Sequence, residues 1–194
     1  MYIDNTNEST NLFIYLYFSV QMSQHTEKPE YRFNINYGIN NAITVKTGDI
    51  SKEGYKLDTN SMPRTADWPT LDDRQRTLID QVLGHMEGGI YFTIEDKNLY
   101  AERLCRTQIF RTDKKYESIK LDRKVKTKIF DVDNRDETSV CLTLAREINK
   151  GDSLPFKKVL VYVEIYNIEK HNQLVNYDPT KISSSLDPLI SDSM

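Results

Sequence analysis

The chain has 194 residues, of which 38% are hydrophobic and 28% are charged. This length and composition are those of one globular domain, which can bury a sizeable core without needing metal ions or disulfides. The formal net charge of −3 argues against a nucleic-acid-binding domain, because such domains carry an excess of Lys and Arg.

The cysteines and the N-terminal segment indicate the cellular compartment in which the protein is expected. Cys105 and Cys141 have no other Cys or His nearby at metal-binding spacing, so we expect reduced thiols in a cytoplasmic or nuclear protein. The apolar run 12–18 is too short to span a bilayer, and no Lys or Arg precedes it as in a signal peptide. We interpret the run as an edge strand or interface segment within a partly disordered N-terminal extension, residues 1–29.

Strand patterns begin after this extension. In residues 31–37 apolar and polar side chains alternate, which predicts a half-buried strand. Residues 42–47 are expected to pair with that strand as a hairpin across 38–41. Residues 48–69 are predicted to form a turn-rich stretch.

A helix is predicted to start near Thr70, which is expected to cap its first turn. Apolar residues then recur at helical spacing on one face: Leu71, Leu78, Ile79, Val82, Leu83 and Met86. Gly88 and Gly89 are expected to end this helix.

Short strands and a second helix are predicted in the rest of the chain. The strands are expected at residues 90–94, 99–103, 108–112 and 125–131, with a polar loop over 113–122. A second helix is expected over residues 136–150, ended by Gly151. The apolar run 159–163 predicts a strand over 159–166 that is buried on both faces. Residues 174–177 are predicted to form one more strand, before a flexible Ser-rich tail at 181–194.

Motifs for catalysis or metal binding are missing. The sequence holds neither a nucleophile elbow nor a phosphate-binding glycine loop, and its 3 histidines are far apart. Residues 131–136 resemble the start of a calcium loop, but Asp136 stands where that loop requires Gly. We interpret them as the acidic start of a helix. The sequence therefore predicts no enzymatic activity, no cofactor and no metal site.

Blocks of sequence between residues 30 and 179 carry a family resemblance. They are Asp-Trp-Pro-Thr-Leu at 67–71, Gly-Gly-Ile-Tyr-Phe at 88–92, Leu-Tyr-Ala-Glu-Arg-Leu-Cys at 99–105, Lys-Leu-Asp-Arg at 120–123, Lys-Ile-Phe-Asp at 128–131, Ser-Leu-Pro-Phe at 153–156 and Asn-Tyr-Asp-Pro at 176–179. In this order and spacing they resemble the association domain of the interferon regulatory factor family.

The resemblance implies a fold and a function. The fold would be α+β, a β-sandwich of the Smad and forkhead-associated type with flanking helices and loops, over residues 30–180. Domains of this family act in innate immunity, in cytoplasm and nucleus, as protein–protein interaction modules. The expected role is dimerisation or co-activator binding in transcriptional regulation. Expected partners are a second copy, full-length family members, co-activators and phosphorylated adaptor segments.

The resemblance also implies a binding site. In innate-immune members a basic surface receives a phosphorylated Ser-containing tail, and the residue-by-residue match gives Arg103 as the best candidate here. Arg106 lies three residues on, where the family often has a polar residue or His. Lys124, Lys126 and Lys128 form a basic stripe nearby. A guanidinium fork matches phosphate oxygens, and Lys adds charge. The same residues are also explained by surface ion pairs, a solvated strand face or a weak nuclear-import signal.

The family's DNA-binding half is not recognisable in these residues. That domain carries a tryptophan repeat, whereas Trp68 is the only tryptophan here. Direct DNA binding is therefore not expected. We expect either a truncated modulator of full-length relatives or part of a longer transcription factor. The alternative function is a stand-alone phosphopeptide-binding module in signalling.

Overall fold

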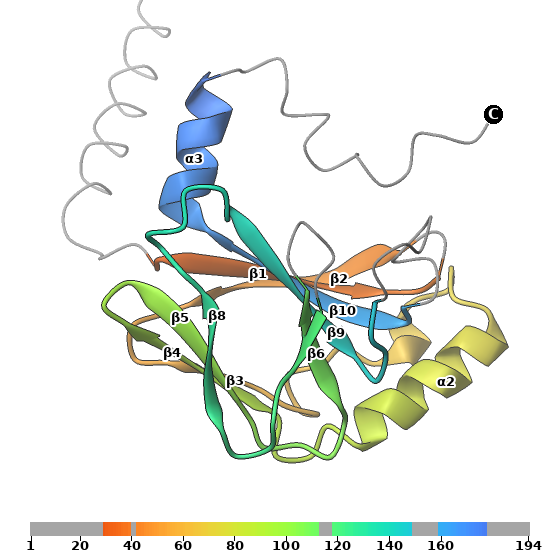
Figure 1. Cartoon of the computed structure of the whole chain (residues 1–194). Coiled ribbons are helices and arrows are strands. Elements are labelled where there is room, and N and C mark those ends of the chain that lie inside the picture. The colour runs from red at the N-terminus through yellow and green to blue at the C-terminus, as the bar shows by residue number, and fades with distance from the viewer. Residues whose placement is uncertain (1–28, 40–41, 113–117, 149–158, 178–194) are drawn as a thin grey trace, which may run out of the picture.

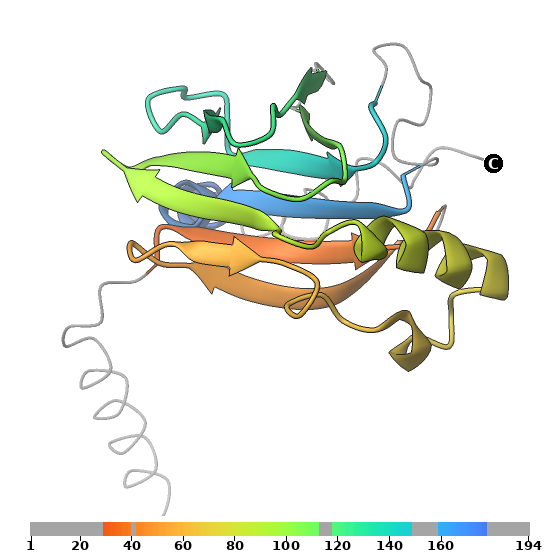
Figure 2. The same ribbon diagram turned by 90° about the horizontal axis from the view of Figure 1, so that it is seen from below.

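The computed structural model describes residues 29–39, 42–112, 118–148 and 159–177. Within these residues, ten strands form two antiparallel sheets that pack face to face, with α2 and α3 at opposite ends of the sandwich (Figures 1 and 2). The β-sandwich with flanking helices predicted from the sequence is therefore confirmed.

The two sheets differ in size. The larger sheet has the order β2–β1–β10–β9–β6–β7. It contains β1 (Tyr31–Tyr37), β2 (Ile43–Ile50), β6 (Ile109–Thr112), β7 (Ser118–Lys120), β9 (Ser139–Leu144) and β10 (Val161–Asn167). The smaller sheet has the order β3–β4–β5–β8, with β3 (Tyr55–Leu57), β4 (Ile90–Glu95), β5 (Asn98–Arg103) and β8 (Lys126–Phe130). The helices are η1 (Thr65–Asp67), α2 (Asp73–Gly84) and α3 (Ile168–Tyr177).

The core lies between the sheets and is built by alternation along the strands. In β1, Phe33, Ile35 and Tyr37 are buried, as the sequence pattern predicted. Tyr31 meets Phe130 of the opposite sheet edge-on, with ring centroids 5.2 Å apart. Burying side chains of this size stabilises a fold by about 1.5–3 kcal/mol each. The register of β1 is fixed because a shift by one residue would expose all of them.

The predicted hairpin is confirmed, and its second strand is longer than expected. β2 pairs with β1 as far as Ile50. Gly48 permits this, because a Cβ there would lie 2.5 Å from the ring of Phe33. The stretch over 48–69 that was predicted to be turn-rich also contains a short strand, β3 (Tyr55–Leu57). Tyr55 packs against Phe33 with ring centroids 5.0 Å apart, a long-range contact that no local pattern reveals.

The first long helix is confirmed, but its cap was wrongly assigned to Thr70. Asp72 is the N-cap of α2, and its side chain accepts a hydrogen bond from the backbone N–H of Gln75 at 2.7 Å. The Gln75 side chain accepts in return from the backbone N–H of Asp72. This reciprocal capping box satisfies two N–H groups that the first helical turn leaves free.

The end of α2 was also predicted too late. The helix ends at Gly84. Gly88 and Gly89 instead form the turn into β4, with φ angles of +87° and +71°. A Cβ at Gly89 would lie 2.3 Å from the carbonyl oxygen of Leu57. Glycine is therefore required there for close backbone approach as well as for its left-handed conformation.

The predicted helix over residues 136–150 is wrong, because the segment contains β9. Val140, Leu142 and Leu144 are buried with a period of two. β9 pairs with β10 on one side and with β6 on the other. Residues 131–136 accordingly form a loop before a strand, not a helix start; in it Asp131 accepts a hydrogen bond from the backbone of Asp133 at 3.0 Å.

The C-terminal predictions were partly wrong. The strand over 159–166 is confirmed as β10, but its burial alternates: Val161, Val163 and Ile165 are buried while the residues between them are half-buried. The short strand predicted over 174–177 is wrong, since those residues belong to α3. Periodicity over four residues is too short to separate a strand from the last turn of a helix.

Some predictions lie outside the described residues. The polar loop at 113–122 contains β7, and its residues 113–117 are not described. The apolar run 12–18, the residue Gly151 and the tail at 181–194 are likewise outside them. The domain boundaries at 1–29, 30–180 and 181–194 stay predictions.

Candidate functional site

Arg103, the first predicted site residue, is the last residue of β5 and points into the protein. It lies on the same strand face as Leu99 and Ala101, and only 8% of it is exposed. Its guanidinium donates to the carbonyl oxygen of Thr107 at 2.9 Å. Its Nε is buried and has no acceptor in the described part of the chain. The side chain thus holds the loop that follows β5.

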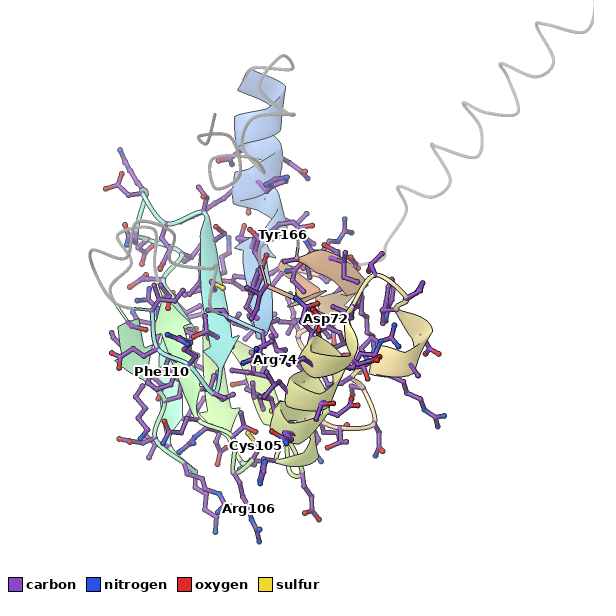
Figure 3. The ribbon with its side chains drawn as sticks, turned by 90° about the vertical axis from the view of Figure 1, so that its right-hand side faces the viewer. Asp72, Arg74, Cys105, Arg106, Phe110 and Tyr166 are labelled. Atoms are coloured by element: carbon purple, nitrogen blue, oxygen red, sulfur yellow. The ribbon has the colours of Figure 1, made fainter. Side chains whose placement is uncertain are left out.

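That loop, residues 104–107, is fixed by backbone hydrogen bonds. The N–H groups of Leu104 and Cys105 donate to the Gly89 carbonyl at 2.9 and 3.0 Å. The N–H groups of Arg106 and Thr107 donate to the His85 carbonyl at 3.0 and 3.1 Å. Burial raises the pKa of the Cys105 thiol, which lies inside the loop. Arg106 is therefore held on a rigid loop, and its side chain is exposed at the end of the molecule (Figure 3).

Arg123 and Lys124 border the same loop. The Arg123 Nε donates to the carbonyl oxygen of Leu104 at 3.1 Å. The backbone N–H of Lys124 donates to the carbonyl oxygen of Arg103 at 2.8 Å. We call Arg106, Arg123 and Lys124 the basic cluster. All three are exposed, and none forms an ion pair with any described residue. They form a local concentration of positive charge in a chain whose net charge is −3.

Lys126 and Lys128 lie farther along, on the outer face of the smaller sheet. Lys126 pairs with Glu95 and lies over the Tyr100 ring, 5.1 Å from its centroid. Lys128 pairs with Asp131 at 2.6 Å, and this hydrogen bond raises the pKa of Lys128. Their charges are compensated by neighbouring carboxylates, although such exposed pairs contribute little to stability.

The structure therefore divides the predicted site residues into three groups. Arg106 and Lys124 are exposed and border the same loop. Arg103 lies beside them but is buried. Lys126 and Lys128 are each engaged by a carboxylate. Arg123, which was not among the predicted site residues, completes the cluster. A role in phosphate or partner binding stays a prediction for all of them.

We also searched the described residues for metal sites, disulfides and membrane-spanning helices. Among them, no group of three or more His, Cys, Asp or Glu side chains could hold a metal ion. Cys105 and Cys141 are free thiols. No helix in the described ranges is long and apolar enough to cross a membrane.

Known proteins resemble both the sequence and the fold. Residues 9–135 match the family model described as interferon-regulatory factor 3. The chain belongs to the interferon regulatory factor family. No curated protein matches the sequence significantly.

Two solved structures share the fold of this family member. The interferon regulatory factor 9 IAD domain superposes with a TM-score of 0.56 at 15% identity, over 84% of this chain and 95% of that one. A chain in the crystal structure of STAT2 in complex with IRF9 gives 0.52 at 11% identity, over 78% and 99%. The assignment to the association domain, with its Smad and forkhead-associated type of sandwich, is confirmed. The domain is a protein–protein interaction module of the interferon regulatory factor type.

Proposed function

We propose that this interferon regulatory factor domain mediates dimerisation with family members or binding of co-activators, and that it docks acidic partner segments on the basic cluster. One observation carries the proposal. Three exposed cations, one on a rigid loop and two bordering it, have no ionic partner among the described residues. Unpaired charges that converge at one surface are suited to steering and orienting a partner of opposite charge.

The structural neighbours support a role in assembly. A related chain occurs in a crystal structure of STAT2 in complex with IRF9, so this fold occurs in a complex between proteins. We extend that role to the present domain, acting in the cytoplasm and the nucleus without enzymatic activity.

A second candidate function is recognition of phosphorylated segments. Arg106 has the planar guanidinium that binds two phosphate oxygens at once, and Lys124 adds a point charge. Phosphoserine carries a charge of about −1.5 to −2 at pH 7 and offers three acceptor oxygens. The two functions use the same cluster and differ in how strongly binding depends on phosphate.

Fluorescence anisotropy with labelled acidic peptides tests the proposal. One peptide carries phosphoserine, and a matched peptide carries serine in its place. We expect the Arg106→Ala and Lys124→Ala variants to weaken binding by about tenfold each, because a hydrogen bond to a charged group contributes about 1.5–3 kcal/mol. Arg135→Ala is the matched control, since Arg135 is equally exposed but lies in the loop that contacts α3.

The outcomes separate the candidates. Equal loss of affinity for both peptides supports docking of acidic partners in general. Loss confined to the phosphopeptide supports the second candidate. If the double variant Arg106→Ala/Lys124→Ala binds both peptides as tightly as the unchanged protein, the basic cluster is not the docking surface.

A further inference from the structure

The smaller sheet ends at β8, an edge strand that no other strand of the described residues covers. β8 pairs with β5 on one side only (Figure 1). The larger sheet continues farther on this side of the sandwich, through β6 and β7. β6 lies near the edge, because the Arg111 Nε donates to the carbonyl oxygen of Ile129 in β8 at 2.9 Å. The proposed function uses the residues before β8 and leaves this edge without a role.

The backbone of β5 shows which groups of β8 are used for pairing. In an antiparallel sheet, successive residues direct their N–H and C=O groups to opposite sides. The Lys124 N–H donates to the carbonyl oxygen of Arg103 at 2.8 Å, so the backbone of Arg103 faces β8. Two residues earlier, Ala101 faces β8 as well, and it lies opposite Thr127. Thr127 therefore uses its N–H and C=O groups for the pairing with β5.

The backbone groups of Lys126 and Lys128 consequently point away from β5. No described residue forms a hydrogen bond with their N–H or C=O groups, although both side chains have partners. Both residues are exposed. The contact of Arg111 with Ile129 ends this stretch. Main-chain donors and acceptors in a row at an exposed edge are a template for an added strand.

An apolar side chain beside this edge is only partly covered. Ile119 of β7 lies opposite Arg111 of β6 and hence on the same face of the larger sheet. That face is directed toward the smaller sheet, because Arg111 reaches the Ile129 carbonyl. Ile119 is nevertheless 52% exposed, since the smaller sheet ends at β8 whereas the larger sheet continues. A fifth strand next to β8 would lie over this side chain.

The side chains along the edge determine which segment fits. Lys126 and Lys128 lie on the outer face of the smaller sheet, and their exposed pairs with Glu95 and Asp131 contribute little and can be exchanged. Residues directly opposite each other in a sheet are stabilising when their charges are opposite and destabilising when they are alike. The matching segment therefore carries carboxylates at every second position, with apolar side chains between them on the side of Ile119. A second copy of β8 would set lysine against lysine and is disfavoured.

We propose that an extended acidic segment of a partner protein binds to β8 as a fifth, antiparallel strand of the smaller sheet. Its main chain bonds to Lys126 and Lys128, its carboxylates face the two lysine side chains, and its apolar residues cover Ile119. In strand addition of this kind, main-chain hydrogen bonds give affinity and alternate side chains give specificity. That the segment belongs to a protein partner rests on the proposed function, whereas the pairing of the edge does not.

Backbone N-methylation of a peptide tests the strand addition directly. The probe is the labelled peptide acetyl-Glu-Val-Glu-Val-Glu-Val-Glu-amide, titrated with the full chain in fluorescence anisotropy. In the antiparallel arrangement the Glu N–H groups face β8 and the Val N–H groups face away from it. We expect methylation of the Glu nitrogens to weaken binding at least tenfold, and methylation of the Val nitrogens to weaken it less than twofold. This comparison uses the unchanged chain and does not depend on the folding of a variant.

Two measurements on the protein complement the peptide pair. Hydrogen exchange of the Lys126 and Lys128 amides should slow at least tenfold in the complex, while exchange in β3, the opposite edge strand, stays unchanged. The Lys126→Glu/Lys128→Glu variant should weaken binding at least tenfold, because it sets like charges against the peptide. The matched control is Lys56→Glu, at an exposed lysine of β3, which should leave the affinity unchanged.

Three results would overturn the proposal: no saturable binding of the unmethylated peptide, a Val-methylated peptide that binds no better than the Glu-methylated one, or unchanged exchange of the Lys126 and Lys128 amides in the complex. The basic cluster is tested separately. If Arg106→Ala/Lys124→Ala leaves the affinity unchanged while Glu methylation abolishes binding, the strand addition stands and the docking role of the cluster fails. The converse pattern removes the strand addition and leaves the cluster.

Discussion

Arg103 shows at the residue scale what a sequence resemblance does not give, namely the direction and burial of a side chain. Its identity matches the family block, and the resemblance therefore pointed to a phosphate contact. Resemblance transfers residue identity but not side-chain direction. The alternation of β5 turns Arg103 inward with Leu99 and Ala101, where its guanidinium holds the Thr107 carbonyl. Arg106, three residues on, has the exposure that a partner contact needs.

The two arginines should therefore respond differently to truncation. Arg103→Ala is expected to lower the free energy of unfolding by about 1–3 kcal/mol, because it leaves the Thr107 carbonyl without its donor. Arg106→Ala is expected to change it by less than about 0.5 kcal/mol, as is usual for an exposed site. Urea unfolding followed by circular dichroism measures both. Equal effects of the two substitutions would show that Arg103 does not hold the loop.

The exposed lysines illustrate a second limit at this scale. A basic run in a sequence gives the number of charges but not their partners. Lys126 and Lys128 meet Glu95 and Asp131 in space, whereas Lys124 meets no carboxylate among the described residues. Only the fold distinguishes compensated from uncompensated charge, so the sequence could predict the candidates and not the cluster.

At the element scale, predictions succeeded where the pattern was local and failed where pairing was distant. The alternation of β1 and the helical spacing in α2 both predict their elements directly. β9 was mistaken for a helix, because its structure depends on pairing with β10 and β6. Long-range strand pairing regularly overrides local propensity. The end of α2 was predicted too late, because the sequence alone does not show which glycine follows the helix. Gly84 is the last helical residue, whereas Gly89 adopts the left-handed conformation in the turn into β4.

These two glycines give a matched test of the element boundaries. Gly84→Ala should stabilise the protein by about 0.5–1 kcal/mol, since an alanine is favoured in a helix and its Cβ would meet nothing within 4 Å. Gly89→Ala should destabilise it by about 2 kcal/mol or more, through left-handed strain and contact with Leu57. Thermal unfolding of both variants gives the comparison. The same sign of effect for both would contradict the turn geometry described for Gly89.

At the scale of the whole molecule, the basic cluster lies at the end of the sandwich opposite to α3 (Figures 1 and 3). The basic cluster borders the loop bonded to His85 at the end of α2. Figures 1 and 2 show α2 and α3 at opposite ends. We expect a partner that docks on the basic cluster to approach the α2 end of the sandwich.

We infer that the domain associates with other proteins through the basic cluster. Analytical ultracentrifugation with a full-length interferon regulatory factor tests it most directly, using the unchanged chain and the Arg106→Glu/Lys124→Glu variant. We predict a stoichiometric complex whose Kd rises at least tenfold in the variant, because the introduced carboxylates repel an acidic partner. For the unchanged chain the Kd should also rise with salt concentration, because salt screens the attraction between opposite charges. No complex at tens of micromolar protein, or a complex that forms equally well with the variant, would contradict the claim.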